Sequence, residues 1–153
     1  MRDLHYLFSV AEKLLDCAHN CICNAEKGNS KAIRAVATFN IHKALEVLLV
    51  VAYSTKGLGH CPTNHDLHTM LNGYTRDNYE LSPTMVDDLF LVTTLTPEWF
   101  RNGNYTGNTE VDDDKLIKAF VSVVRFMDLL RETNYYSKQD KTSNEVKPLI
   151  LGD

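Results

Sequence analysis

Three polar side chains, His42, Lys43 and Glu46, interrupt a segment that is otherwise mostly apolar. If the segment is helical, His42 and Glu46 share a face, because residues four apart are neighbours on a helix surface. One interpretation is that the cluster faces a ligand cleft, where the Lys43 ammonium group attracts an anion such as phosphate. The other is that the three residues form the solvent side of an amphipathic helix. Both interpretations stay open.

A second polar group, Arg101, Asn104 and Tyr105, precedes the last expected helix. An arginine can hold a phosphate and its developing charge, and RNA cleavage would also need a group that moves a proton. No histidine follows Arg101, because His68 is the last of the six. A tyrosine with an ordinary pKa of about 10 is a poor general base at neutral pH. The segment therefore suits phosphate binding better than RNA cleavage, and an ordinary polar loop is the alternative.

Asn64, His65, Asp66 and Leu67 have the composition of a helix start. Asn64 is a favoured N-cap, Asp66 would meet the positive end of the helix dipole, and Leu67 would enter the core. His65 could additionally bind a phosphate or a partner group, since helix starts attract anions.

Metal and cofactor chemistry is not predicted. The cysteines and histidines lack the spacing of a structural zinc module, and Cys17 and Cys21 fall on one helical face, as small buried apolar residues do. The chain has no glycine-rich phosphate loop and no signature of a hydrolase or metalloprotease. The acidic run 112–114 is interpreted as helix-start acid.

The composition is that of a soluble, single-domain protein. The chain has 153 residues, of which 44% are apolar and 24% are charged. The net charge of −4 argues against a generally basic protein that coats nucleic acid, although a local basic patch remains compatible with it. The longest apolar run, Val47 to Tyr53, is far shorter than the roughly 20 residues of a membrane helix. The N-terminus lacks the features of a signal peptide, so we expect a cytoplasmic protein with reduced cysteines.

Apolar residues recur every three or four positions and predict an all-α fold, an antiparallel up-and-down bundle of four to five helices. A buried strand is the competing interpretation for residues 48–53. We expect residues 96–109 to form a loop, residues 1–137 to form the bundle and residues 138–153 to form a flexible tail. The expected helices span about 3–26, 31–55, 65–74, 83–94 and 113–136.

Phe39 to Leu71 resembles the core of a HEPN domain, a small helical module associated with nucleotides, nucleotidyltransferases and RNA. The family often carries an acid-Lys-Ala-Leu-Lys-like run, and Lys43, Ala44 and Leu45 match it, whereas the flanking His42 and Glu46 differ in charge. Residues 65–67 match the His-Asp-Leu part of a Thr-His-Asp-Leu-like helix start. The resemblance extends over roughly residues 32–131.

The resemblance implies a homodimeric bundle with a polar cleft. Ribonuclease-type members pair an arginine with a histidine four to six residues later, which this chain lacks after Arg101. We therefore expect a non-catalytic module that binds a nucleotide or RNA phosphate, a partner nucleotidyltransferase, or both. Such a module could belong to a two-component, toxin–antitoxin-like system. The expected phosphate ligands are Lys43, Arg101, Asn104 and Tyr105, and the expected cleft-shaping residues are His42, Glu46, His65 and Asp66.

Two alternatives stay open. One is a divergent ribonuclease toxin in which folding brings His42, His65 or His68 to Arg101. The other is a purely structural or regulatory bundle. Three larger side chains could contact a dimer partner or pack in the core: Met70, Phe90 and Trp99.

Overall fold

The computed structural model describes residues 3–24, 30–59, 61, 66–76, 81–95 and 113–143, and for residues 30, 31 and 135–143 it describes the backbone only. All regular secondary structure within these ranges is helical, which confirms the predicted all-α bundle. The five helices are α1 (Leu4–Cys23), α2 (Ser30–Lys56), α3 (Leu67–Arg76), α4 (Pro83–Thr94) and α6 (Asp113–Ser143).

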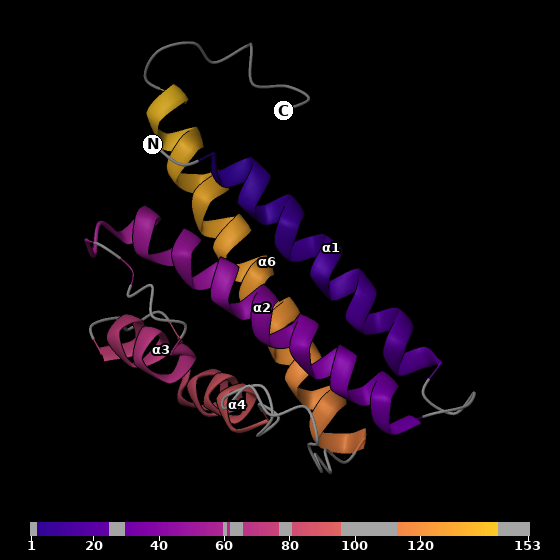
Figure 1. Cartoon of the computed structure of the whole chain (residues 1–153). Helices are drawn as coiled ribbons and strands as arrows, with labels where there is room; N and C mark the ends of the chain where they lie inside the picture. Colours follow the sequence, from indigo (N-terminus) through magenta and orange to yellow (C-terminus); the bar gives the residue numbers. More distant parts are fainter. Residues whose placement is uncertain are drawn as a thin grey trace.

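The helices form an up-and-down arrangement around α2 (Figure 1). α1 runs antiparallel to α2, and its last turns meet the first turns of α6, where the rings of His19 and Phe120 lie 5.7 Å apart. α2 and α6 begin at the same end of the bundle. The short helices α3 and α4 together return the chain from the end of α2 to the start of α6 (Figure 1). They therefore take the place of one long descending helix.

Side-chain caps set the helix starts. Asp3 accepts a hydrogen bond from the Tyr6 amide at 3.2 Å, and Ser82 accepts one from the Met85 amide at 3.1 Å. Pro83 occupies the first position of α4, where its missing N–H costs no helical hydrogen bond, so the predicted start of α4 is confirmed. The predicted start of α3 at His65 is wrong, because Asp66 precedes the helix and caps it. Aspartate is as good an N-cap as asparagine.

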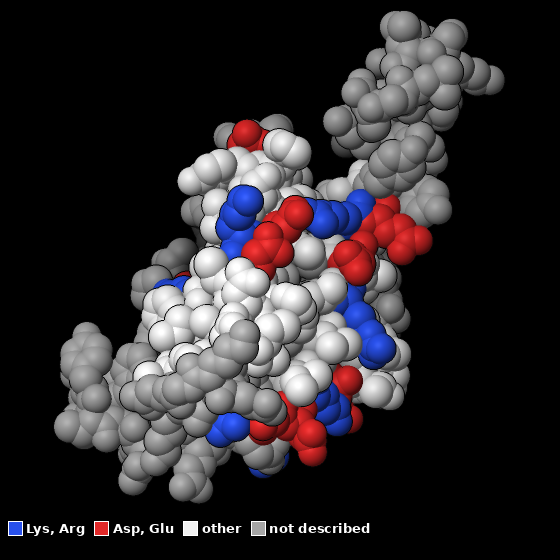
Figure 2. All heavy atoms as spheres, turned by 90° about the vertical axis from the view of Figure 1, so that its right-hand side faces the viewer, with Lys and Arg blue, Asp and Glu red and all other residues white. Residues whose placement is uncertain are grey.

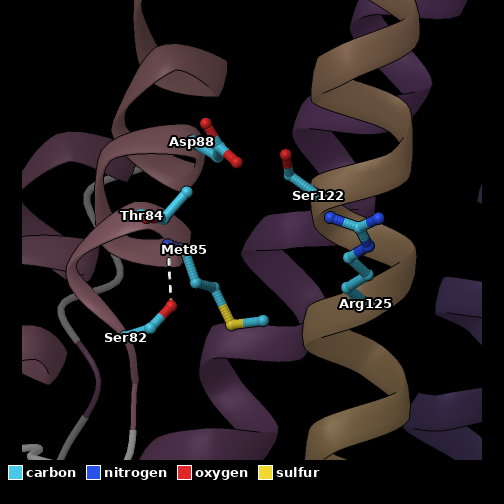
Figure 3. A pocket seen from close by; sticks show the side chains of 6 residues that line it. All are labelled: Ser82, Thr84, Met85, Asp88, Ser122 and Arg125. Atoms are coloured by element: carbon cyan, nitrogen blue, oxygen red, sulfur yellow. Dashed lines mark hydrogen bonds between the residues drawn. The ribbon is translucent and has the colours of Figure 1, made fainter.

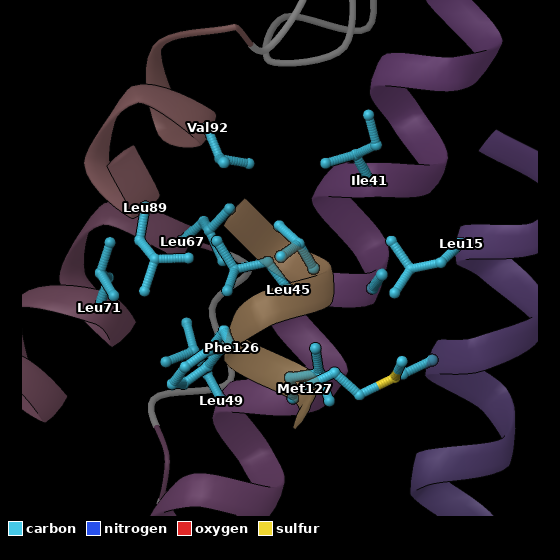
Figure 4. Close-up of a cluster of buried hydrophobic side chains, with 14 of the residues drawn as sticks. Leu15, Ile41, Leu45, Leu49, Leu67, Leu71, Leu89, Val92, Phe126 and Met127 are labelled. Carbon is cyan, nitrogen blue, oxygen red and sulfur yellow. The ribbon is translucent and has the colours of Figure 1, made fainter. Parts of the chain in front are cut away.

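The core lies where α2 meets the other four helices (Figure 4). Leu45, Leu48 and Leu49 of α2 are fully buried, and each buried leucine of this kind contributes about 1.5–3 kcal/mol relative to an exposed one. Ile41 of α2 points toward Val92 of α4, and Phe126 of α6 reaches the same cluster (Figure 4). Burial on several faces explains why residues 48–53 are apolar nearly all round. The alternative of a strand there is wrong.

Two boundaries differ from expectation. α6 continues to Ser143, past the predicted end at Tyr136, because residues 137–143 contain no glycine or proline that would stop a helix. The predicted flexible tail therefore begins inside a helix, and residues 144–153 lie outside the described part of the chain.

The central helix α2 has a length and an apolar composition that are also found in membrane-spanning helices. Residues 32–56 are long and apolar enough to cross a membrane, but 56% of the critical window is buried inside the bundle. The core helix of a soluble protein meets the same criterion, so this property alone does not indicate a membrane span.

Candidate functional site

Lys43 lies on the outer side of α2, within a half-buried polar and aromatic group. Its Nζ is 3.1 Å from Glu46 Oε2, and it lies over the Phe39 ring at 6.0 Å from the centroid. The side chains of Lys43 and Glu46 are only 30% and 18% exposed. Partial burial strengthens electrostatic interactions, because fewer water molecules screen the charges. The two residues therefore form a charged pair that a phosphate could join only by sharing the ammonium group with Glu46.

His42 does not lie on the solvent-exposed side of α2, as one interpretation of the sequence predicted. Its side chain is 6% exposed and belongs to the interior of the bundle. The reason is its position on α2: Thr38, one turn before it, and Leu45, one turn after it, are buried as well. The interpretation of His42 as part of a solvated face is therefore wrong.

The helices on either side of the segment that carries Arg101, α4 and α6, both pack against α2. The segment begins after α4, whose Val92 points toward Ile41 of α2 (Figure 4). It ends at Asp113, the first residue of α6, which pairs with Arg34 of α2. Arg34 Nε is 2.8 Å from Asp113 Oδ1, and Arg34 Nη2 is 3.0 Å from Asp113 Oδ2. Only the Nη2 contact is a hydrogen bond, and Nε approaches the carboxylate without making one, so the pair combines one charge-assisted hydrogen bond with a close charge contact.

Three of the predicted phosphate ligands lie outside the described residues: Arg101, Asn104 and Tyr105. The contacts of Val92 and Asp113 nevertheless lie along one half of α2, the half that extends from Arg34 to Ile41. Lys43 follows two residues after Ile41 on the same helix, but on the opposite side of it, about 200° round the axis.

The third predicted group behaves as a helix cap. Asp66 Oδ1 accepts a hydrogen bond from the Thr69 amide at 3.2 Å, and Oδ2 accepts one from the Thr69 hydroxyl at 2.7 Å. These two hydrogen bonds, the hydroxyl first, lower the pKa of the Asp66 carboxyl group because they favour its charged form. His65 lies outside the described residues. His68 is exposed, with its ring 5.1 Å from the ring of Phe90.

The residues expected at a dimer interface divide between core and surface. Met70 is 2% exposed and packs in the core, so it offers no contact to a partner. Phe90 is half-buried at the edge of the core, and Trp99 lies outside the described residues.

No known protein family, characterised protein or solved structure matches this chain. The likeness to HEPN domains therefore remains an expectation from the residues quoted in the sequence analysis.

Cysteine and histidine do not gather into a metal site within the described ranges, where no group of three or more potential ligands occurs. Cys23 Sγ and His19 Nε2 are 3.6 Å apart on the last turns of α1. Cys17 is exposed, so its predicted burial is wrong, while Cys21 is half-buried. Burial, followed by the neighbouring Cys17, raises the pKa of the Cys21 thiol.

A small cleft between α4 and α6 was not predicted from the sequence. Its volume is about 90 Å³, and side chains from both helices point into it (Figure 3). Asp88 in the cleft pairs with Lys118 at 3.5 Å. The spacing of Lys118, Ser122 and Arg125 at i, i+4 and i+7 on α6 was the available signal, because it places all three on one helical face. The lining residues are Ser82, Thr84, Met85, Asp88, Ser122 and Arg125.

Charges of both signs alternate over one face of the molecule. Lysine and arginine side chains lie beside aspartate and glutamate side chains, with uncharged surface between the groups (Figure 2). Arg131 of α6 and Glu12 of α1 form an ion pair at 2.7 Å. A face of this kind does not attract the nucleic-acid backbone over a wide area, so a phosphate would need a local site.

Proposed function

We propose that this chain is a non-catalytic binding module of the HEPN type, which holds a phosphate of a nucleotide or RNA between Lys43 and the segment containing Arg101, Asn104 and Tyr105. In this proposal its biological partner is a nucleotidyltransferase of a two-component system in the cytoplasm. The observation that carries the proposal is the packing of α4 and α6, the helices on either side of that segment, against α2 beside Ile41 and at Arg34.

Chain geometry sets the route by which Arg101 could reach Lys43. Lys43 lies nine residues after Arg34, which corresponds to about 14 Å along a helix. Arg101 is six residues beyond Leu95, the cap of α4, and six extended residues span at most roughly 20 Å. Ile41 and Lys43 lie on opposite sides of α2, so the segment would have to pass around this helix, which is about 10–12 Å across, for the Arg101 guanidinium group to approach Lys43.

The chemistry of the proposed site favours binding over cleavage. An arginine fork and a lysine ammonium group are common phosphate ligands, and both form charge-assisted hydrogen bonds. Glu46 competes for Lys43, so Arg101 would have to supply much of the affinity. RNA cleavage would need a proton-transfer group, and no histidine follows Arg101 in the sequence.

The outer face of α2 favours an additional protein partner. Val36 is 50% exposed, and Val47 and Val50 on the same side are only partly buried. These residues lie near Lys43 along one helix, where a second copy or a nucleotidyltransferase could cover apolar surface next to the bound phosphate. We propose a homodimer, with this face as part of its interface.

Calorimetric titration of the purified chain with ATP, GTP and a short RNA tests the binding proposal. We expect saturable binding that Arg101→Ala and Lys43→Ala each weaken at least about tenfold, a loss of about 1.4 kcal/mol. Lys13→Ala is the matched control, because Lys13 is an exposed cation of α1 far along the chain from both. Absence of heat with all three ligands, together with unchanged behaviour of Arg101→Ala, would leave only partnership with another protein.

The same preparation tests the enzyme alternative. Incubation with mixed RNA should leave the RNA intact, and expression should not slow growth. Cleavage that Arg101→Ala abolishes would replace the proposal with a divergent ribonuclease.

A further inference from the structure

The cleft between α4 and α6 contains a cation that has no ion-pair partner among the described residues. Arg125 lines the cleft from α6, while the nearest carboxylate in the lining, Asp88, pairs with Lys118. An unpaired arginine beside a cavity keeps its five N–H donors available for a ligand, and its planar fork matches a carboxylate.

The hydroxyl groups of the cleft provide a hydrogen-bond donor at Ser82 and a hydrogen-bond acceptor at Ser122. Ser82 accepts the Met85 amide hydrogen at 3.1 Å, so its own O–H hydrogen is available to donate. Ser122 is 5% exposed and donates to the Lys118 carbonyl at 2.6 Å, which leaves its oxygen as an acceptor. Asp88 adds a carboxylate acceptor, and Ser122 points toward it (Figure 3).

The size and polarity of the cleft restrict the ligand. A volume of about 90 Å³ equals the share of about three water molecules, at roughly 30 Å³ each. A ligand that satisfies both sides needs an anionic head for Arg125 and Ser82 and a hydrogen-bond donor for Asp88 and Ser122. A bare anion would leave Asp88 facing it, which is unfavourable.

We propose that this cleft binds a small carboxylate that carries a neighbouring hydroxyl or ammonium group, as hydroxy acids and amino acids do. The carboxylate pairs with Arg125 and the hydroxyl of Ser82, and the donor group of the ligand bonds to Asp88. The site shares no residue with the proposed phosphate site on α2, so either can fail alone.

NMR titration of the full chain with lactate, acetate and inorganic phosphate tests the proposal. We expect saturable shifts of the Arg125 Nε–H and Ser122 amide signals with lactate, and weaker binding of acetate, which lacks the donor. Arg125→Gln should weaken lactate binding at least about tenfold, because it removes a charge-assisted interaction. Lys13→Gln removes one positive charge from exposed α1 and should leave lactate binding unchanged.

Asp88→Asn separates the proposed ligand from a simple anion. This variant should reduce the preference for lactate over acetate while its amide spectrum stays that of a folded protein. The proposal is overturned if lactate causes no saturable shifts, if acetate and phosphate bind as well as lactate, or if Arg125→Gln and Lys13→Gln have equal effects.

Discussion

Arg34 near the start of α2 and Asp113 at the start of α6 form an ion pair with two contacts, at 2.8 and 3.0 Å. The pair joins residues that are 79 positions apart and holds the start of α6 against α2. Its side chains are 29% and 58% exposed, so solvent weakens its contribution to stability. Its main consequence is that it positions the start of α6 beside α2.

The first prediction separates two effects of the Arg34–Asp113 pair, one on ATP binding and one on the stability of the fold. Arg34→Gln should reduce the free energy of unfolding by no more than about 1 kcal/mol, as exposed ion pairs do. The same variant should weaken ATP binding, because the start of α6, which follows the segment containing Arg101, loses its ion pair with α2. Chemical denaturation and calorimetric titration measure the two effects. Restoration of ATP affinity in the charge-swapped variant Arg34→Glu/Asp113→Lys would support the positional role, whereas unchanged affinity in Arg34→Gln would contradict it.

The second prediction concerns the contact between α2 and α3. The Tyr53 hydroxyl donates to the Met70 carbonyl at 2.9 Å and passes directly over Gly73, where an added Cβ would overlap it. Gly73→Ala should therefore destabilise the protein by about 1–3 kcal/mol, the usual cost of overpacking. In a Tyr53→Phe background the hydroxyl is absent, and the remaining ring carbon would lie 3.5 Å from the new Cβ.

Thermal or chemical denaturation of the two single variants and the double variant measures this coupling. Tyr53→Phe alone should cost about 1 kcal/mol for the lost hydrogen bond. Gly73→Ala in that background should be neutral or stabilising by up to about 1 kcal/mol, since alanine is the better helix former. Equal costs of Gly73→Ala in both backgrounds would show that the hydroxyl does not occupy the space over Gly73.

The third prediction is a pH dependence that arises at Asp66. Its hydrogen bonds from Thr69 lower its pKa in the folded state, so its contribution to stability is present above the ordinary aspartate pKa of about 4. That contribution disappears as the pH falls through the lower, folded pKa. Asp66→Ala should therefore cost about 1 kcal/mol at pH 7, a typical value for a lost N-cap, and progressively less toward pH 2. A constant difference between pH 7 and pH 2 would contradict the capping role.

Helix content was predictable because long amphipathic periodicity dominates the sequence. Ser82 and Pro83 identified the start of α4 to the residue, since a cap followed by proline has one favourable placement. The end of α6 was not predictable in the same way, because polar residues without glycine or proline neither require nor prevent a helix.

The site was less predictable than the fold. The pair of Lys43 with Glu46 was foreseeable, because residues three apart on a helix are neighbours on its surface. The burial of His42 was not, because a histidine in a helical pattern can face either way and only the packing of other helices decides. The cleft with Arg125 was only partly indicated, because the spacing on α6 puts Ser122 and Arg125 on one helical face, whereas the packing of α4 against that face brings in Asp88.

The most direct test of the account is a double-mutant cycle on ATP affinity with Lys43→Ala, Arg101→Ala and the double variant. If both side chains hold the same phosphate, their losses should not add, and the coupling should be about 1 kcal/mol or more. Losses that add within about 0.5 kcal/mol, or single variants that bind ATP like the unmodified chain, would contradict a shared site.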